Sequence, residues 1–300
     1  MRRLLIIGCG DVMRRTLPQL VRRWHVLALV RQRDPQLETL GVTQIEGDLD
    51  RPDSLRRLAG IADVVIHSAP PPAQGNGDPR TRNLIAALQR GKSLPRHLVY
   101  ISTSGVYGDC GGARVSETRS PAAKSARAVR RVDAERRLRR FGRQAGRHCR
   151  VSILRAPGIY AEDRLPLERL HKKLPLMLHA EDSHTNHIHA VDLGRACIAA
   201  LARAGANRVY NINDDTTLAM GEWFDALADA FALPRAPRLP REEVRRNVPP
   251  MQWSFMAESR RLDNTRMKRE LRLRLRYPTV ATGILAATTK MTTAETSCSG

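Results

Sequence analysis

The stretch Leu4-Leu5-Ile6-Ile7-Gly8-Cys9-Gly10-Asp11-Val12-Met13 decides the fold. Its apolar run is typical of a buried strand, and the apolar spacing after Met13 is typical of a helix. A strand, a glycine turn and a helix in this order open a dinucleotide-binding βαβ unit, whose turn holds a pyrophosphate at the positive end of the helix. We therefore expect a cofactor to contact four residues of this turn, which are Gly8, Gly10, Asp11 and Val12.

The turn lacks one element of the dinucleotide fingerprint G-x-G-x-x-G. Met13 stands where the third glycine belongs, and that glycine normally lets the helix pack closely on the strand. A glycine turn of some other α/β protein therefore remains the alternative at this point.

The second apolar run, residues 25–30, indicates which dinucleotide is bound. It ends at Arg31, and Arg33 follows two residues later. An acidic residue at the end of this strand suits the ribose hydroxyls of NAD, whereas an arginine suits the 2′-phosphate of NADP. The sequence favours NADP, with NAD as the alternative cofactor; two ordinary surface charges are the other interpretation of the arginines.

Length, cysteines and charge limit the class of protein. The 300 residues suffice for one large α/β domain with a small lobe, and they contain no apolar run of membrane-spanning length. The five cysteines are scattered, which favours a reduced cytoplasmic setting and argues against a zinc ribbon or a disulfide framework, and we expect no metal site. A net charge of +21 suggests nucleic acid, but residues 124–147, where arginine is densest, contain one aromatic side chain only, Phe141, and no series of them interleaved with the arginines. We prefer a solvated helix face and do not expect nucleic acid as a partner.

Apolar runs alternate with helical patterns along the first half of the chain. Strands are expected over 4–7, 25–30, 42–46, 63–67, 97–101 and 151–154, and helices over 52–58, 79–89, 122–141, 162–171, 220–231 and 264–271. This alternation predicts an α/β fold with a doubly wound parallel sheet and a small C-terminal substrate lobe. We assign residues 1–160 and 185–213 to a dinucleotide-binding domain and 161–184 and 214–282 to the lobe. Residues 283–300 are expected to form a disordered tail.

Five motifs together resemble the extended short-chain dehydrogenase/reductase superfamily, also called the NAD-dependent epimerase/dehydratase family. The resemblance covers about residues 1–285. The motifs are Gly8-Cys9-Gly10-Asp11, Gly47-Asp48-Leu49, Tyr100-Ile101-Ser102-Thr103-Ser104-Gly105-Val106-Tyr107-Gly108-Asp109, Leu154-Arg155-Ala156-Pro157-Gly158-Ile159-Tyr160, and Asn186-His187-Ile188-His189-Ala190-Val191-Asp192-Leu193.

The resemblance implies a role for each motif. Asp48 and Leu49 would hold the adenine ring, and Thr103 would take the place of the catalytic Ser or Thr that bonds the substrate oxygen. The other residues implied at the cofactor are Ser68, Ala69, Pro70, Ser102, Arg131 and Pro157. A small-molecule substrate, an oxidoreductase or epimerase activity and a possible oligomer follow from the same resemblance.

The chain departs from this family at the catalytic pair. The family carries Tyr-x-x-x-Lys on the long helix, and alignment on Glu135 places Arg127 at the Tyr position and Arg131 at the Lys position. A guanidinium, with a pKa above ~12, cannot act as the acid or base. Two functions follow. One is an atypical oxidoreductase in which Arg127 polarises a carbonyl, Arg131 bonds the nicotinamide ribose, and Thr103, Tyr107 or a water handles the proton. The other is a catalytically silent NADP-binding redox sensor.

Overall fold

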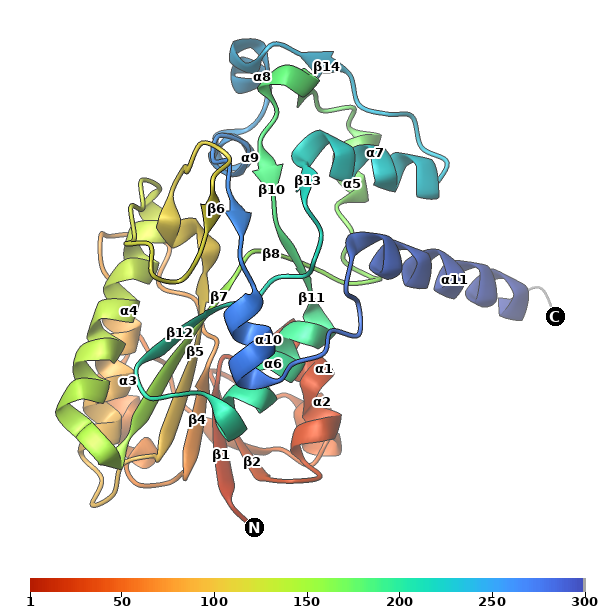
Figure 1. Cartoon of the computed structure of the whole chain (residues 1–300). Helices are drawn as coiled ribbons and strands as arrows, with labels where there is room; N and C mark the ends of the chain where they lie inside the picture. The colour runs from red at the N-terminus through yellow and green to blue at the C-terminus, as the bar shows by residue number, and fades with distance from the viewer. Residues whose placement is uncertain (299–300) are drawn as a thin grey trace.

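Seven parallel strands form the central sheet of the computed structural model, which describes residues 1–298 (Figure 1). They lie in the order β12-β7-β5-β4-β1-β2-β3. Their bounds are β1 (Arg3–Ile7), β2 (His25–Val30), β3 (Thr43–Glu46), β4 (Val64–His67), β5 (His97–Thr103), β7 (Arg150–Ala156) and β12 (Arg208–Asn211). Each strand was expected from its apolar run except β12, whose position in the chain falls in the region where the alternation weakens.

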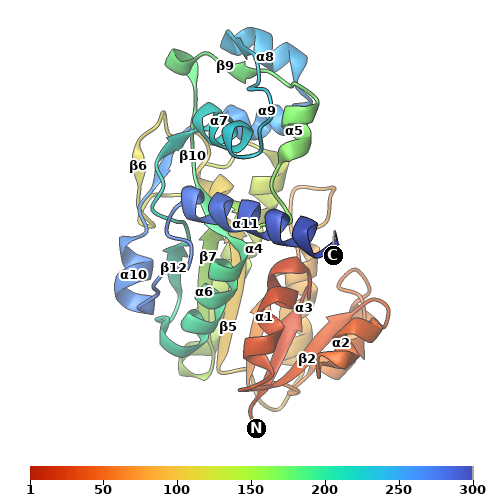
Figure 2. The same cartoon turned by 90° about the vertical axis from the view of Figure 1, so that its right-hand side faces the viewer.

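Helices cover both faces of this sheet. One face carries α1 (Asp11–Leu20), α6 (Ala190–Arg203) and α10 (Thr265–Leu271), and the other carries η1 (Pro52–Leu58), α3 (Pro79–Gln89) and α4 (Ala126–Ala145) (Figures 1 and 2). The short α2 (Pro35–Thr39) packs beside β3. Alternate residues of β1 point into the two layers, Leu4 and Ile6 into one and Leu5 and Ile7 into the other. The doubly wound fold predicted from the sequence is confirmed.

The strand order reverses at the junction of β1 and β4, and Gly8 lies at that junction. Its φ is +89°, and a Cβ built on it would lie 2.5 Å from the backbone nitrogen of Ala69. The backbone N–H groups of Ser68 and Ala69 both donate to the carbonyl of Ile7. Only glycine fits this crossing, because a side chain would collide with the neighbouring backbone.

A small lobe stands over the carboxyl ends of the strands, at the top of Figure 1. It contains α5 (Leu167–His171), β9 (Leu176–Met177), β10 (His184–Thr185), β13 (Leu218–Ala219), α7 (Met220–Ala230), β14 (Arg238–Leu239), α8 (Arg241–Asn247) and α9 (Pro250–Met256). It has its own apolar core, built around Trp223, Phe224 and Leu227. Two short parallel pairs lie between lobe and sheet: β8 (Gly158–Tyr160) with β11 (His187–His189), and β6 (Arg114–Val115) with β15 (Arg261–Leu262).

Two helices differ from the expected bounds by more than one residue, and the longer of them, α4, also ends later than expected, at Ala145 instead of residue 141. The long helix starts at Ala126 instead of residue 122, because the Ser125 hydroxyl accepts from the N–H of Ala128 and caps it there. The helix expected over 162–171 is only α5, because its N-cap is Pro166 and a proline disfavours helical backbone in the residue before it.

The expected disordered tail is wrong over most of its length. Residues Val280–Cys298 form helix α11, which crosses between the lobe and the sheet layer in Figure 2. Val280, Ile284 and Ala287 are buried, and the first two join the core of the lobe, so an apolar stripe at helical spacing holds this segment. Residues 299–300 of the expected tail lie outside the described residues. Within residues 1–298, no helix has the length and apolar character needed to cross a membrane.

Candidate functional site

A cleft of about 830 Å³ runs along the carboxyl ends of β1, β4, β5 and β7. Its walls bring together eleven of the residues expected at the site. They are Gly8, Gly10, Asp11, Val12, Ser68, Pro70, Ser102, Thr103, Arg127, Arg131 and Pro157. Segments that are far apart in sequence converge here because the carboxyl ends of parallel strands share one edge of the sheet.

The N-terminus of α1 opens into this cleft. Its N-cap is Gly10, whose missing side chain leaves the first N–H groups of the helix without a side-chain acceptor. A Cβ on Gly10 would meet no protein atom within 4 Å, so the space beside it is open. Free N–H groups, a helix dipole and an open approach are the features that bind a pyrophosphate. Asp11, in the first turn, is held by Arg15 and Arg164 at 2.9 and 2.8 Å.

Five predicted cofactor residues lie outside the walls of the cleft. Arg31 is exposed at the end of β2, and Arg33 forms an exposed ion pair with Glu46 at 2.8 Å. Asp48 and Leu49 follow β3, where the Asp48 N–H donates to the Ser54 hydroxyl. Ala69 lies against Gly8 and packs on the apolar core beneath the sheet.

Ser102 is committed to a buried network beneath the cleft. Its hydroxyl donates to Glu135 at 2.7 Å, and the Arg155 guanidinium donates to the same carboxylate at 3.0 and 2.7 Å. The Thr103 hydroxyl instead accepts from the N–H of Gly105 at 3.2 Å, and its own proton stays available. Thr103 is thus the hydroxyl at this strand end that can donate to a ligand.

Arg131 is fixed on the wall of the cleft. It donates to the Tyr100 hydroxyl at 2.9 Å and to the carbonyl of Ile101 at 2.7 Å. Burial raises the pKa of Tyr100 to about 12 although Arg131 is beside it. Tyr107, also fully buried, donates to Asn211, and burial raises its pKa as well. Neither tyrosine is placed to act as an acid in the cleft, because each is buried with its hydroxyl already bonded.

Arg127 lies at the junction between this cleft and a second pocket, and it lines both. Its guanidinium carbon is 3.9 Å from the ring centroid of Phe255, which comes from α9 in the lobe. Burial lowers the pKa of this guanidinium, but an arginine keeps its charge at any ordinary pH. The position expected for a titrating phenol therefore carries a permanent cation.

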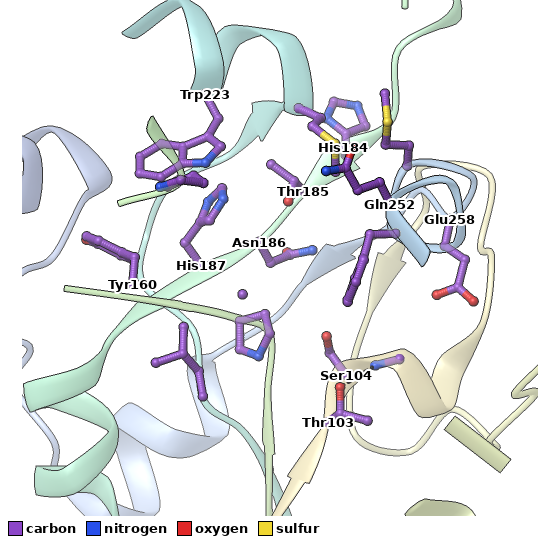
Figure 3. A pocket seen from close by; sticks show the side chains of 18 of the residues that line it. Thr103, Ser104, Tyr160, His184, Thr185, Asn186, His187, Trp223, Gln252 and Glu258 are labelled. Atoms are coloured by element: carbon purple, nitrogen blue, oxygen red, sulfur yellow. Dashed lines mark hydrogen bonds between the residues drawn. The ribbon is translucent and has the colours of Figure 1, made fainter. Parts of the chain in front are cut away.

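The second pocket, about 380 Å³, lies between the strand ends and the lobe. Figure 3 shows Thr103 and Ser104 at one side and Tyr160, His187 and Trp223 at the other. The three rings form a cluster, with His187 4.5 Å from Trp223 and Tyr160 5.6 Å from Trp223 between centroids. We call this group the aromatic wall.

The aromatic wall is electrically neutral. Burial lowers the pKa of His187 to about 3 and raises the pKa of Tyr160. His189, two residues further along β11, stacks on Tyr277 at 3.7 Å instead of turning into the pocket. In residues 1–298 no three His, Cys, Asp or Glu side chains are grouped as metal ligands would be.

Sequence reasoning did not identify Arg169 or Trp223 as site residues. Trp223 follows an ordinary helical apolar pattern, for which a core position is the simplest prediction. Arg169 is one of many arginines, and nothing in its surroundings in the sequence marks it as buried. Only the irregular chain path of the lobe brings both to the pocket.

Comparison with known proteins gives one family match. Residues 8–204 match the family model described as NAD(P)H-binding. No functionally curated protein sequence matches the chain.

Solved structures match over nearly the whole chain. A conserved protein of unknown function from Silicibacter pomeroyi is 25% identical, with a TM-score of 0.78 and coverage of 97% of this chain and 99% of that one. The UDP-glucose 4-epimerase of Thermotoga maritima, solved with UDP-glucose, is 17% identical, with a TM-score of 0.76 and coverage of 97% and 99%. The UDP-glucuronic acid 4-epimerase of Bacillus cereus, solved with NAD, is 18% identical, with a TM-score of 0.72 and coverage of 94% and 96%.

Proposed function

The chain belongs to the NAD(P)H-binding family, and we propose that it binds NADP(H) in the cleft and presents it to a small molecule in the second pocket. The open N-terminus of α1 beside Gly8 and Gly10 is the observation that carries this proposal. These groups would hold the pyrophosphate, and Ser68, Pro70 and Pro157 would line the rest of the path. The cofactor, when bound, supplies hydride chemistry.

Three side chains of this chain would position the substrate. Thr103 donates its free hydroxyl proton to a substrate oxygen at the junction of cleft and pocket. Arg127 adds a cation beside that oxygen, and Arg131 holds the edge of the cleft through Tyr100 and Ile101. Negative charge that develops on the substrate oxygen is thereby stabilised.

Arg127, His187 and Tyr160, which lie around this junction, are not suited to exchange the proton. Arg127 does not titrate in the ordinary range, His187 is neutral and buried, and Tyr160 has a raised pKa. Water must then serve as the proton source, and general acid–base catalysis by a side chain is worth roughly 10²–10⁴-fold in rate. We therefore propose an oxidoreductase with slow turnover.

The second candidate is a catalytically silent NADP(H) sensor. The charge of Arg127 at the position of the acid favours it, because binding survives the loss of the phenol while turnover does not. Arg31, exposed at the end of β2, is the residue proposed to choose NADP over NAD in either case.

A titration of the purified protein with NADPH tests the shared premise. We expect saturable binding, followed by enhanced nicotinamide fluorescence, with NADH binding more weakly. Absence of saturation with both dinucleotides would refute both candidates. With binding established, NADPH oxidation in the presence of carbonyl compounds separates them, because the oxidoreductase turns over slowly and the sensor does not.

A further inference from the structure

The second pocket carries an excess of positive charge. Four arginines line it, Arg127, Arg164, Arg169 and Arg260, and Glu258 is the carboxylate among its lining residues. Arg260 pairs with Glu258 at 2.8 Å and Arg164 pairs with Asp11 at 2.8 Å. Neither Arg127 nor Arg169 forms an ion pair with a carboxylate within residues 1–298. Arg127 and Arg169, the two of these arginines without an ion pair in the described chain, therefore line the same small pocket.

Of these two charges, that of Arg169 costs more free energy to bury. It is only 8% exposed, and its donors reach the side-chain oxygen of Gln252 at 3.1 Å and the carbonyl of Pro175 at 2.7 Å. Its Nε has no hydrogen-bond partner among the described residues. Burial lowers the pKa of this guanidinium to about 10, although the Asp182 carboxylate acts against that shift, so the surrounding charges offset the burial only in part. An anion in the pocket would compensate it.

Arg127 is shaped to bind that anion. Stacking on Phe255 uses the flat face of the guanidinium and leaves its N–H donors in the plane. No hydrogen bond from these donors to another described residue is found. A planar fork of donors held in one orientation matches the two oxygens of a carboxylate.

The opposite side of the pocket suits an apolar body. The aromatic wall presents the rings of Tyr160, His187 and Trp223, and Met220 and Phe224 extend it. Nδ1 of His187 is buried without a partner, so the wall offers one polar atom to a ring substituent. Gly283 of α11 lies against the Tyr160 ring and holds the wall in place.

From this division we propose that the second pocket binds a small aromatic carboxylate, with its acidic group on Arg127 and its ring on the aromatic wall. The proposal rests on the proposed function only in that the cofactor is bound in the adjacent cleft. In this proposal Arg127, which stands where the family resemblance implies a tyrosine, binds the substrate. A tyrosine at that position would instead exchange a proton.

Matched acid and amide pairs test this directly. The probes are benzoate with benzamide, phenylacetate with phenylacetamide, and indole-3-acetate with indole-3-acetamide, titrated by calorimetry with and without saturating NADPH. We expect at least one acid to bind ten- to a hundredfold more tightly than its amide, which is the range for a hydrogen bond to a charged group. Three acids that bind no better than their amides would overturn the proposal, as would tight binding of UDP-glucose with none of the acids bound.

Two variants locate the carboxylate. Arg127→Leu should weaken acid binding by about tenfold or more and leave amide binding unchanged. Arg136→Leu removes the same charge from an exposed position on the same helix and should change neither. An equal loss in both variants would show a general effect of charge and refute the assignment. The NADPH titration is repeated for each protein, so that loss of the cofactor is not mistaken for loss of the acid.

Discussion

The cofactor cleft and the second pocket meet at Thr103 and Arg127, yet they are built by opposite means. The cleft consists mainly of backbone, small side chains and a helix N-terminus at a strand switch point. The pocket consists of large side chains from a lobe of short elements. The cleft and the pocket also differ in the number of buried polar atoms that lack a hydrogen-bond partner. Within residues 1–298, four such atoms belong to residues of the pocket, which are Arg169 Nε, His184 Nδ1, His187 Nδ1 and Arg260 Nε, and none to residues that line only the cleft.

This difference indicates how much the amino-acid sequence of the cleft and of the pocket can vary. Backbone N–H groups at a helix end bind phosphate whatever the neighbouring side chains are, so the cleft survives extensive sequence change. Side chains decide the chemistry of the pocket, and there Arg127 stands where the family resemblance led us to expect a phenol. Loss of an expected catalytic group is therefore compatible with an intact cofactor cleft.

The largest expected effect comes from placing a side chain in the cleft at Gly8. Gly8→Ala puts a Cβ 2.5 Å from the Ala69 backbone at a φ of +89°. We expect a loss of about 3 kcal/mol in the free energy of unfolding, from backbone strain and overpacking together, and no measurable NADPH binding. Urea unfolding and NADPH fluorescence titration measure the two quantities.

Gly10→Ala is the control for this prediction. Its Cβ meets nothing within 4 Å, so its stability should stay close to that of the natural protein while NADPH binding weakens. If Gly8→Ala were as stable as Gly10→Ala, the close crossing at β1 and β4 would not determine the cleft.

The cleft was largely predictable from the sequence, for a physical reason. Apolar runs such as residues 4–7 and 97–101 are long enough to identify buried strands, and the ends of parallel strands must meet at one edge. The same rule brought Gly8, Ser68 and Thr103 together in prediction and in the structure. Arg31 and Arg33 were predictable only as residues at a strand end, and their contact with a cofactor stays a prediction.

The pocket and the C-terminal helix were not predictable in the same way. Tyr160, Arg169 and Trp223 are brought together by turns and two-residue strands, which leave no periodic pattern in the sequence. The composition of residues 283–298, rich in Ala and Thr, conceals that Ile284 and Ala287 continue a stripe from Val280. The burial of that stripe depends on the lobe, which is absent from any local window.

The next effect concerns the pH dependence of stability on the pocket side. Asp214 donates its N–H to the carbonyl of His187 and so supports the aromatic wall. Burial raises the pKa of its carboxyl to about 7, and one carboxyl oxygen has no partner within the described chain. A folded pKa above the unfolded value of ~3.9 means that the folded state binds the proton more tightly. Asp214 therefore destabilises the protein above pH 7, and this penalty fades as the pH falls toward 4.

Asp214→Asn should remove that penalty. Three pKa units correspond to about 4 kcal/mol as an upper limit, and a buried amide also needs partners, so we expect a gain of about 2 kcal/mol at pH 8. The gain should shrink toward zero near pH 4 in urea unfolding. Asp229→Asn, which breaks an exposed pair with Arg235, serves as the control and should show no comparable gain at pH 8. If the free energy of unfolding of both variants changed equally with pH, the pH effect would not come from the Asp214 carboxyl beside the aromatic wall.

The smallest effect concerns the edge of the cleft and tests cofactor choice alone. Arg31 is exposed and Arg33 already pairs with Glu46, so a 2′-phosphate would find its free cation at Arg31. Arg31→Ala should weaken NADPH binding by about tenfold, or about 1.4 kcal/mol, and leave NADH binding unchanged. Arg33→Ala should change the ratio of the two affinities much less. If Arg31→Ala left the ratio of NADPH to NADH affinity unchanged, Arg31 would not select NADP, and NAD would be an equally good candidate for the cofactor. The proposed binding of the pyrophosphate by the backbone at the start of α1 would hold for either dinucleotide.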